Sequence, residues 1–198
     1  GDSARRIGNE YLFQTMAEQN LETFEKYKFK KIVTQCPHCF TTLKNDYSEL
    51  GADLDVVHHS QFIGQLVSEG KIKPKSWMDE DVTYHDACYL GRHNDEYDAP
   101  RDVIQSVMRD GELKEMEQSK EKSFCCGAGG GNMWYEIKTG ERINQNRFEQ
   151  AAETGATTVA TACNFCNIMM EDGMKVTGND EKMKVVDIAE LVAQSFTK

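Results

Sequence analysis

The chain has 198 residues, of which 39% are hydrophobic, and its 23 basic and 33 acidic side chains give a formal net charge of −10 at pH 7. This length and composition are typical of a globular chain of one or two domains, which excludes a disordered chain and a short disulfide-stabilised scaffold. No apolar stretch reaches the roughly 18 residues of a membrane span, and residues 1–6 lack the apolar segment of a signal peptide. The acidic balance, without a cluster of basic residues, argues against a nucleic-acid partner.

The first third of the chain predicts helices and strands in alternation. Residues 3–28 are expected to form one helix, because apolar residues recur on a single helical face. This apolar stripe consists of Phe13, Ala17, Leu21, Phe24 and Tyr27. The elements expected after it are a buried strand at 32–34, a helix from Cys36 to about Tyr47, a strand at 54–58 and a helix at 62–67.

The segment 70–81, in which Pro74 lies among lysines, predicts a linker. The elements expected after it are a strand at 82–84, a helix near 100–108, a strand near 113–116, a helix from Asn132 to about Glu153, a strand at 158–161, a helix at 163–174, a strand at 183–186 and a closing helix from Asp187. Strands that alternate with helices predict an α/β architecture with parallel strands.

Two parts of the sequence resemble each other. Lys31–Cys39 and Thr158–Cys166 share an aliphatic run, a threonine two residues before the first cysteine, and a C-x-x-C unit. Counterparts of the other cysteines of the second part would lie before Gly1. We therefore expect two pseudo-repeated α/β units with short parallel sheets, in a piece of a longer protein: the end of a first module at 1–74 and a complete second module at 75–198.

The cysteines give the strongest functional signal. There are seven, at positions 36, 39, 88, 125, 126, 163 and 166. An odd number, with one adjacent pair and two C-x-x-C units, favours metal binding over a disulfide framework and indicates a reducing, cytoplasmic compartment. For Cys36 and Cys39 alone, a structural zinc or two spare thiols is as reasonable as a cluster.

Five of the cysteines belong to the second unit: Cys88, Cys125, Cys126, Cys163 and Cys166. They follow predicted strands, at the edge of a parallel sheet where ligand groups gather. Five thiolates are one more than a cubane 4Fe–4S cluster or a tetrahedral zinc ion needs, and an adjacent pair fits separate corners of a compact cube poorly. An open, noncubane cluster is the better candidate.

Glycines follow the cysteine pair at Gly127, Gly129 and Gly130. Glycine lets a backbone approach a large cluster closely and direct amide N–H groups at its sulfurs. Asn132 is expected to open one helix at this site, and the second C-x-x-C to open another. We hypothesise that the two helix N-termini stabilise the negative cluster and raise its reduction potential.

The residue patterns around these cysteines resemble a known family. Cys88 to Cys166, with Cys125-Cys126-Gly127 at the centre, resembles the CCG cysteine-rich domain of the heterodisulfide reductase family. The segments Gly1–Leu12, Tyr84–Arg92 and Cys125–Trp134 are similar to the C-terminal half of bacterial membrane-associated iron–sulfur reductases linked to electron-transfer flavoprotein.

The resemblance implies that all five cysteines of the second unit bind a noncubane 4Fe–4S cluster, and that Cys36 and Cys39 belong to another site whose remaining ligands lie upstream. It implies an electron-transfer flavoprotein or another redox protein as partner, and upstream membrane-anchored haem and ferredoxin-like domains at the cytoplasmic face of a membrane. The chain would then be part of an oxidoreductase. Zinc in place of the cluster is the alternative cofactor.

Three function classes follow. The first is an electron-transfer domain between a flavoprotein and a haem and quinone chain; the second reduces a disulfide at the cluster; the third is a zinc-stabilised docking module without redox activity. Among the histidines, His85 either donates to a cluster sulfur or has a capping or surface role. His58 and His59 are better explained as hydrogen-bonded residues than as ligands, and His38 is expected to face solvent.

Overall fold

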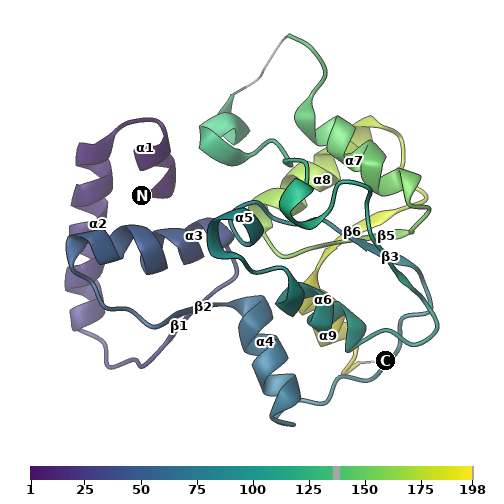
Figure 1. The fold of residues 1–198 in the computed structure, drawn as a ribbon, viewed down its shortest axis with the longest axis horizontal. Helices are drawn as coiled ribbons and strands as arrows, with labels where there is room; N and C mark the ends of the chain where they lie inside the picture. The colour runs from purple at the N-terminus through teal and green to yellow at the C-terminus, as the bar shows by residue number, and fades with distance from the viewer. Residues whose placement is uncertain (136–138, 198) are drawn as a thin grey trace.

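The computed structural model describes residues 1–135 and 139–197 (Figure 1). In these residues the chain forms two short parallel sheets whose strands are separated by helices. The predicted α/β class is therefore confirmed. No helix in these two ranges combines the length and the apolar character that crossing a bilayer would require.

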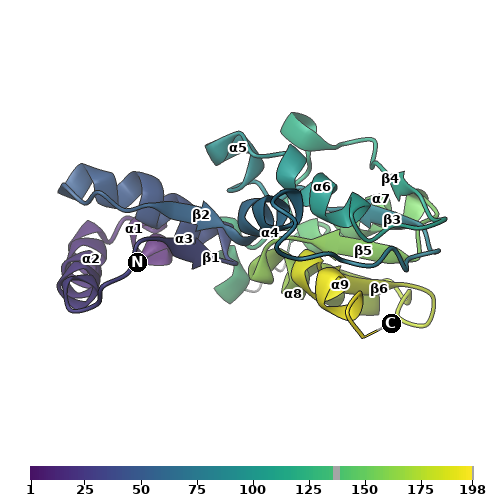
Figure 2. The same cartoon turned by 90° about the horizontal axis from the view of Figure 1, so that it is seen from below.

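The larger sheet consists of β3 (Val82–Tyr84), β4 (Leu113–Lys114), β5 (Thr158–Thr161) and β6 (Lys184–Asp187). The strands lie in the order β4-β3-β5-β6, which can be followed in Figure 2, and every neighbouring pair is parallel. All four residues of β5 are buried. This pattern is typical of a parallel strand covered on both faces.

Helices cover both faces of this sheet. Figure 1 shows α7 (Ile143–Glu153) and α8 (Asn164–Val176) above the strands, and α6 (Asp98–Gln105) and α9 (Ile188–Gln194) below them. Successive residues of β5 point into opposite cores, as the pleat requires. Val159 packs with Phe148 and Met170 of the upper helices, whereas Ala160 belongs to the lower core with Val103 and Leu191.

The smaller sheet pairs β1 (Ile32–Thr34) with β2 (Val56–His58). A continuous helical segment follows β1, formed by α3 (Pro37–Thr41), a π-turn (Thr42–Asp46) and a 3-10 turn (Tyr47–Leu50). Helix α4 (His59–Ser68) follows β2 and packs against α6 and α9. This arrangement repeats the β5–α8–β6–α9 arrangement of the larger unit.

The equivalence of the two units extends to the residues that begin their helices. Cys36 is the N-cap of α3 and Cys163 is the N-cap of α8. His58 is the N-cap of α4, as Asp187 is of α9, and each side chain accepts a hydrogen bond from a backbone amide in the first turn. The same local structure therefore places a cysteine after the first strand of each pair.

The prediction of one helix over 3–28 is wrong. The chain forms α1 (Asp2–Arg6) and α2 (Glu10–Glu25), separated at Gly8, whose φ is +87°. The side chain of Asn9 accepts a hydrogen bond from the amide of Leu12 at 3.1 Å and so starts the second helix. Phe13 of the expected stripe is buried, whereas Tyr27 lies beyond the helix and is exposed.

The prediction of a helix from Asn132 to Glu153 is also wrong over its first part. A 3-10 segment, η4 (Gly129–Trp134), occupies the start, and α7 begins only at Ile143. Gly130 and Gly131 have φ values of +65° and +79°, which an α-helix does not accommodate. Residues 136–138 of the predicted helix lie outside the described residues.

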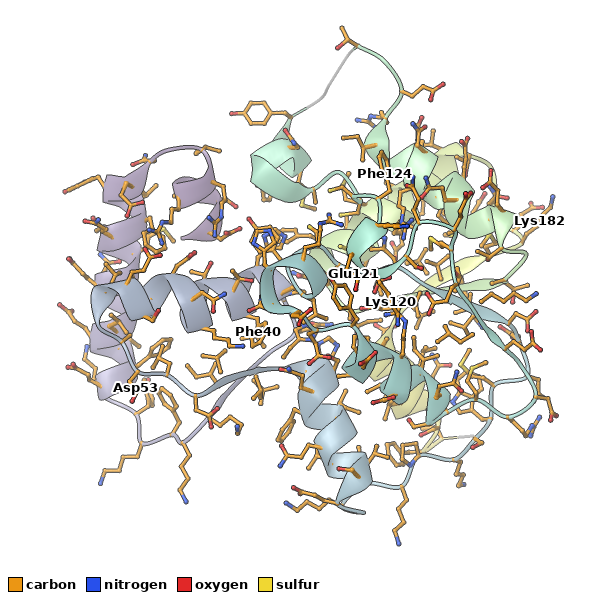
Figure 3. All side chains as sticks on the ribbon, in the orientation of Figure 1. Phe40, Asp53, Lys120, Glu121, Phe124 and Lys182 are labelled. Carbon is orange, nitrogen blue, oxygen red and sulfur yellow. The ribbon has the colours of Figure 1, made fainter. Side chains whose placement is uncertain are left out.

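The segment 70–81 forms neither helix nor strand, but parts of it are buried and hydrogen-bonded. Met78 is 1% exposed and forms a single parallel β-bridge with Met108. The indole N–H of Trp77 donates to the carbonyl of Leu191 at 3.2 Å. The largest core also contains Phe40, which Figure 3 shows between α3 and α4, together with Val82 of the larger sheet. The segment is thus packed against both units.

Candidate metal centre

The carboxyl ends of three strands supply cysteines to one region. Cys36 follows β1, Cys163 follows β5, and Cys88 lies in the loop after β3, which continues into the short helix α5 (Gly91–Asn94). Cys125 and Cys126 lie between η3 (Lys120–Lys122) and η4. Figure 3 shows Lys120, Glu121 and Phe124 on the segment that leads to this pair. All seven cysteines are free thiols.

The seven thiols form a continuous series in which each lies close enough to the next to shift its pKa. The order is Cys88, Cys125, Cys126, Cys166, Cys163, Cys36 and Cys39. The structure therefore brings together the five cysteines of the second unit from three distant segments. It also brings Cys36 of the first unit into contact with Cys163, which the sequence analysis did not anticipate.

Burial differs along the series. Cys126, Cys163 and Cys166 are buried, whereas Cys39 is exposed and the remaining three thiols are partly exposed. The centre of the series is thus shielded from water, and its two ends approach the surface. A buried group of thiolates would carry a large uncompensated charge, which a bound cation relieves.

Among Cys88, Cys125 and Cys126, it is Cys125 whose thiolate form is stabilised. Hydrogen bonding with Cys126 and then with Cys88 lowers its pKa to about 2, and the amide of Gly127 donates to its sulfur at 3.2 Å. Hydrogen bonding with Cys125 raises the pKa of Cys126 to about 12. The thiols therefore share protons in the metal-free chain, and metal binding would release them.

Cys163 is the second stabilised thiolate. Hydrogen bonding with Cys166 and with Cys36 lowers its pKa well below the ordinary value, and the amides of Phe165 and Cys166 add to this effect. These amides lie in the first turn of α8, where the helix dipole favours negative charge. One expected helix N-terminus therefore faces the site, whereas the helix expected to open at Asn132 does not form there.

The glycines after the cysteine pair have different roles. Gly127 and Gly130 have φ values of +91° and +65°, in the left-handed region that favours glycine. A Cβ atom at Gly127 would lie 3.2 Å from the Cβ of Ile143, whereas one at Gly129 would meet nothing within 4 Å. Gly127 is thus required by conformation and packing, and Gly129 by neither.

His85 is a residue of the site rather than of the surface. It is 1% exposed, and one of its ring nitrogens lies within 4.8 Å of the sulfurs of Cys126 and Cys166. Burial, followed by the charge of Arg147, lowers the pKa of His85 to about 3, so the imidazole is neutral. Arg147 itself was missed in the sequence analysis, since an arginine in a predicted helix gives no signal of burial.

His38 does not face solvent, contrary to prediction. It is 8% exposed, its Nδ1 lies 2.8 Å from the carboxylate of Asp2, and its ring stacks on Tyr89 with centroids 3.9 Å apart. Both ring nitrogens of His58 are hydrogen-bonded, to Ser60 and to the carbonyl of Gln35. His58 therefore has no free nitrogen for a metal ion.

A cavity of about 490 Å³ adjoins the exposed end of the thiol series. Cys36, Cys39, His38 and Phe165 contribute to its lining. A second cavity of about 440 Å³ lies beside Gly127 and Met169. Of these two cavities, only the first is lined by cysteines of the series.

A buried ion pair holds the loops that carry Cys88 and Cys125. The guanidinium of Arg101 donates to both carboxylate oxygens of Asp86 at 2.8 and 2.9 Å, and also to Glu115. Asp86 in turn accepts from the amide of Lys120 at 2.8 Å. Asp86, the residue after His85, therefore fixes the start of the segment that leads to Cys125 and Cys126.

These features define a cysteine-rich α/β domain with a buried centre of thiols. The chain matches the family described as "Cysteine-rich domain", CCG, over residues 1–44 and 82–171, and it belongs to that family. The matched ranges include all seven cysteines.

The relatives of the chain are redox proteins. It is 46% identical over 97% of its length to a protein of Syntrophomonas wolfei named EtfAB:quinone oxidoreductase, and 45% identical over 98% of its length to the probable iron-sulfur-binding oxidoreductase FadF of Bacillus subtilis. It is 36% identical over 91% of its length to one component of the dihydromethanophenazine:CoB--CoM heterodisulfide reductase of Methanosarcina barkeri. The chain covers 28%, 28% and 44% of these relatives.

The donor set fits an iron–sulfur cluster. Thiolates are the ligands that such clusters take, and the amide of Gly127 already donates to a cysteine sulfur, as hydrogen bonds to cluster ligands do. The chain is thus an iron–sulfur cysteine-rich domain of oxidoreductases related to heterodisulfide reductase and EtfAB:quinone oxidoreductase.

Proposed function

We propose that this chain is an electron-transfer domain in which Cys88, Cys125, Cys126, Cys163 and Cys166 bind one noncubane 4Fe–4S cluster. The observation that carries the proposal is the unbroken series of thiol contacts from Cys88 to Cys163, with its centre buried. Such a cluster supplies one-electron chemistry when bound. The chain supplies the ligands, the amide donors and the exclusion of water.

Cys36 and Cys39 are proposed to belong to a second metal site. Cys36 contacts Cys163, yet Cys39 is exposed beside the 490 Å³ cavity. Two thiols are too few for a cluster or a structural zinc ion. A longer protein would have to add the remaining ligands at this cavity. The first module is accordingly proposed to end near residue 74 and the second to begin near residue 75.

The proposed electron donor is an electron-transfer flavoprotein or another redox protein, and the proposed acceptors are ferredoxin-like, haem and quinone groups of a longer protein at the cytoplasmic face of a membrane. The relative named EtfAB:quinone oxidoreductase supports this path, as does a relative in Chromohalobacter salexigens, 43% identical, named a probable membrane-anchored ferredoxin. The chain would then take part in an oxidoreductase without binding its organic substrate.

Anaerobic reconstitution tests the proposal. The chain is incubated with ferrous iron and sulfide, or with zinc, and its iron, sulfide and zinc contents are measured. About four irons and a broad visible absorption are expected, whereas a colourless chain with stoichiometric zinc and no iron would contradict the proposal.

Two serine variants localise the cluster. Cys126→Ser should abolish most of the iron, because Cys126 is buried at the centre of the series. Cys39→Ser is the matched control, since this thiol is exposed at the far end, and it should retain the iron of the unsubstituted chain. Equal iron in both variants would rule out the five-cysteine assignment.

A further inference from the structure

Arg147 is a fully buried cation beside the thiol centre. It lies on α7, is 0% exposed, and its Nε donates to Nδ1 of His85 at 3.0 Å. Its other donors reach the carbonyl of Gln118 at 3.0 Å, the side chain of Gln150 at 2.7 Å and the hydroxyl of Ser123 at 3.2 Å. None of these four acceptors carries a formal charge.

A buried guanidinium without a carboxylate contact is costly, because desolvation of the charge is not offset by an ion pair. Within residues 1–135 and 139–197, no carboxylate forms an ion pair with Arg147. The negative groups that act on it through space are Asp86 and the thiols of Cys166, Cys126 and Cys125. Asp86 has the largest electrostatic influence on Arg147 among these groups, and the thiol centre adds to it.

The hydrogen bond to His85 fixes the state of the imidazole. A guanidinium has donors and no acceptor, so Nδ1 of His85 must offer its lone pair to Arg147. A neutral imidazole then carries its proton on Nε2. Its single lone pair is thus occupied, and the group that remains available is an N–H donor. The proximity of His85 to Cys126 and Cys166 would otherwise indicate a metal ligand.

We infer that Arg147 and His85 act together as positioning residues for the cluster: Arg147 holds His85 as an Nε2–H donor that faces the sulfurs, and excludes it from the ligand set. This inference rests on the proposed function. A hydrogen bond to a cluster sulfur and a nearby buried cation both stabilise the more negative, reduced state, so the pair raises the reduction potential.

The principal test measures the reduction potential of the reconstituted chain and of His85→Ala, His85→Gln and Arg147→Lys variants. His85→Ala removes the donor and should lower the reduction potential by about 59 mV, which corresponds to a tenfold change in the equilibrium of a one-electron couple. His85→Gln retains an N–H group and should recover part of the shift. Arg147→Lys keeps the charge but not the forked donor geometry, and should give a smaller negative shift.

Iron content separates a positioning role from a ligand role. His85→Ala and His85→Gln should both retain the iron of the unsubstituted chain. Loss of iron comparable to that of Cys126→Ser would make His85 a ligand and overturn the inference, as would an unchanged potential in His85→Ala. Phe148→Leu is the matched control: it is the next residue on α7, buried with Met116 and Met170, and should lower stability without changing the potential.

A measurement on the metal-free chain judges the inference separately from the proposed function. Long-range nitrogen–proton correlation spectra should show an unprotonated Nδ1 and a protonated Nε2 in His85. A protonated Nδ1 would overturn the role of Arg147, even if the cluster forms. If the unsubstituted chain binds no iron, the proposed function fails together with the influence on potential.

Discussion

The same local structure, a strand followed by a cysteine that begins a helix, occurs twice: at Cys36 between β1 and α3, and at Cys163 between β5 and α8. We call this local structure the cysteine corner. The two corners differ in burial. β5 is buried along its whole length between β3 and β6, and the C-x-x-C that follows it is buried at both cysteines. β1 pairs with β2 alone among the described residues, its Val33 is 44% exposed, and Cys39 is exposed.

This difference indicates what a buried thiol centre requires beyond the corner itself. In the second unit a neighbouring strand, β3, leads to Cys88, and the segment after β4 supplies the vicinal cysteines. α8 also packs closely on α7. The local motif is shared, but the covering strands and helices decide whether its thiols are shielded from water.

The largest expected effect on stability comes from the ion pair that supports the second corner. Arg101→Met leaves Asp86 buried without its cation, which should lower the free energy of unfolding by about 3–5 kcal/mol. Urea denaturation of the metal-free chain measures this change. Arg109→Gln removes an exposed pair with Asp79 and should leave the midpoint nearly unchanged. Equal losses in both variants would contradict the structural role of the buried pair.

A matched pair of glycine substitutions compares the helices of the two units. A Cβ atom at Gly173 of α8 would lie 2.7 Å from the carbonyl oxygen of Asn144 and 2.9 Å from the Cβ of Phe148. Gly173→Ala should therefore destabilise the chain by about 1–3 kcal/mol. A Cβ atom at Gly64 of α4 would meet nothing within 4 Å, so Gly64→Ala should stabilise the chain by about 0.5–1 kcal/mol.

Thermal denaturation of both glycine variants provides the measurement. Opposite shifts of the melting temperature are expected. A stabilising effect of Gly173→Ala would show that α7 and α8 do not approach as closely as described.

The contact between the repeated units gives a smaller effect. Asp187 begins α9 by accepting from the amide of Ala189 at 2.8 Å, and lies 3.2 Å from His59 of the first unit. Burial raises the pKa of Asp187, but hydrogen bonding and the charge of His59 outweigh it and lower the pKa overall. Since the folded pKa is below the unfolded pKa, Asp187 stabilises the fold above the ordinary carboxyl range, and this contribution is lost as pH falls through the folded value.

Asp187→Ala should accordingly cost about 1–2 kcal/mol at neutral pH. Asp187→Asn keeps an N-cap and should cost less. Denaturation at neutral and acidic pH measures the free energy of unfolding of both variants. The difference in this free energy between the unsubstituted chain and Asp187→Asn should diminish at acidic pH. A difference that grows as pH falls would contradict the assigned sign.

The elements predicted well are those determined by local pattern. β5 was predicted at its observed bounds, and the cysteine corners were placed after their strands. The sequence also indicated α9, whose N-cap Asp187 is a standard start signal.

The errors have tertiary or conformational causes. Gly130 and Gly131 adopt left-handed conformations that a helical pattern does not reveal, so the start of α7 was placed too early. His38 is buried by Asp2 and Tyr89, which come from distant parts of the chain. The contact between Cys36 and Cys163, likewise, depends on how the two units pack and has no local signature.

The most direct test of the central claim uses Cys88, the thiol that comes from its own segment after β3 and lies at one end of the series. The iron content and visible spectrum of anaerobically reconstituted Cys88→Ser are compared with those of the unsubstituted chain. If five thiols from three segments bind one cluster, the variant should lose most of its approximately four irons and its spectrum should change. A variant with full iron and an unaltered spectrum would show that Cys88 is not a ligand and would contradict the account.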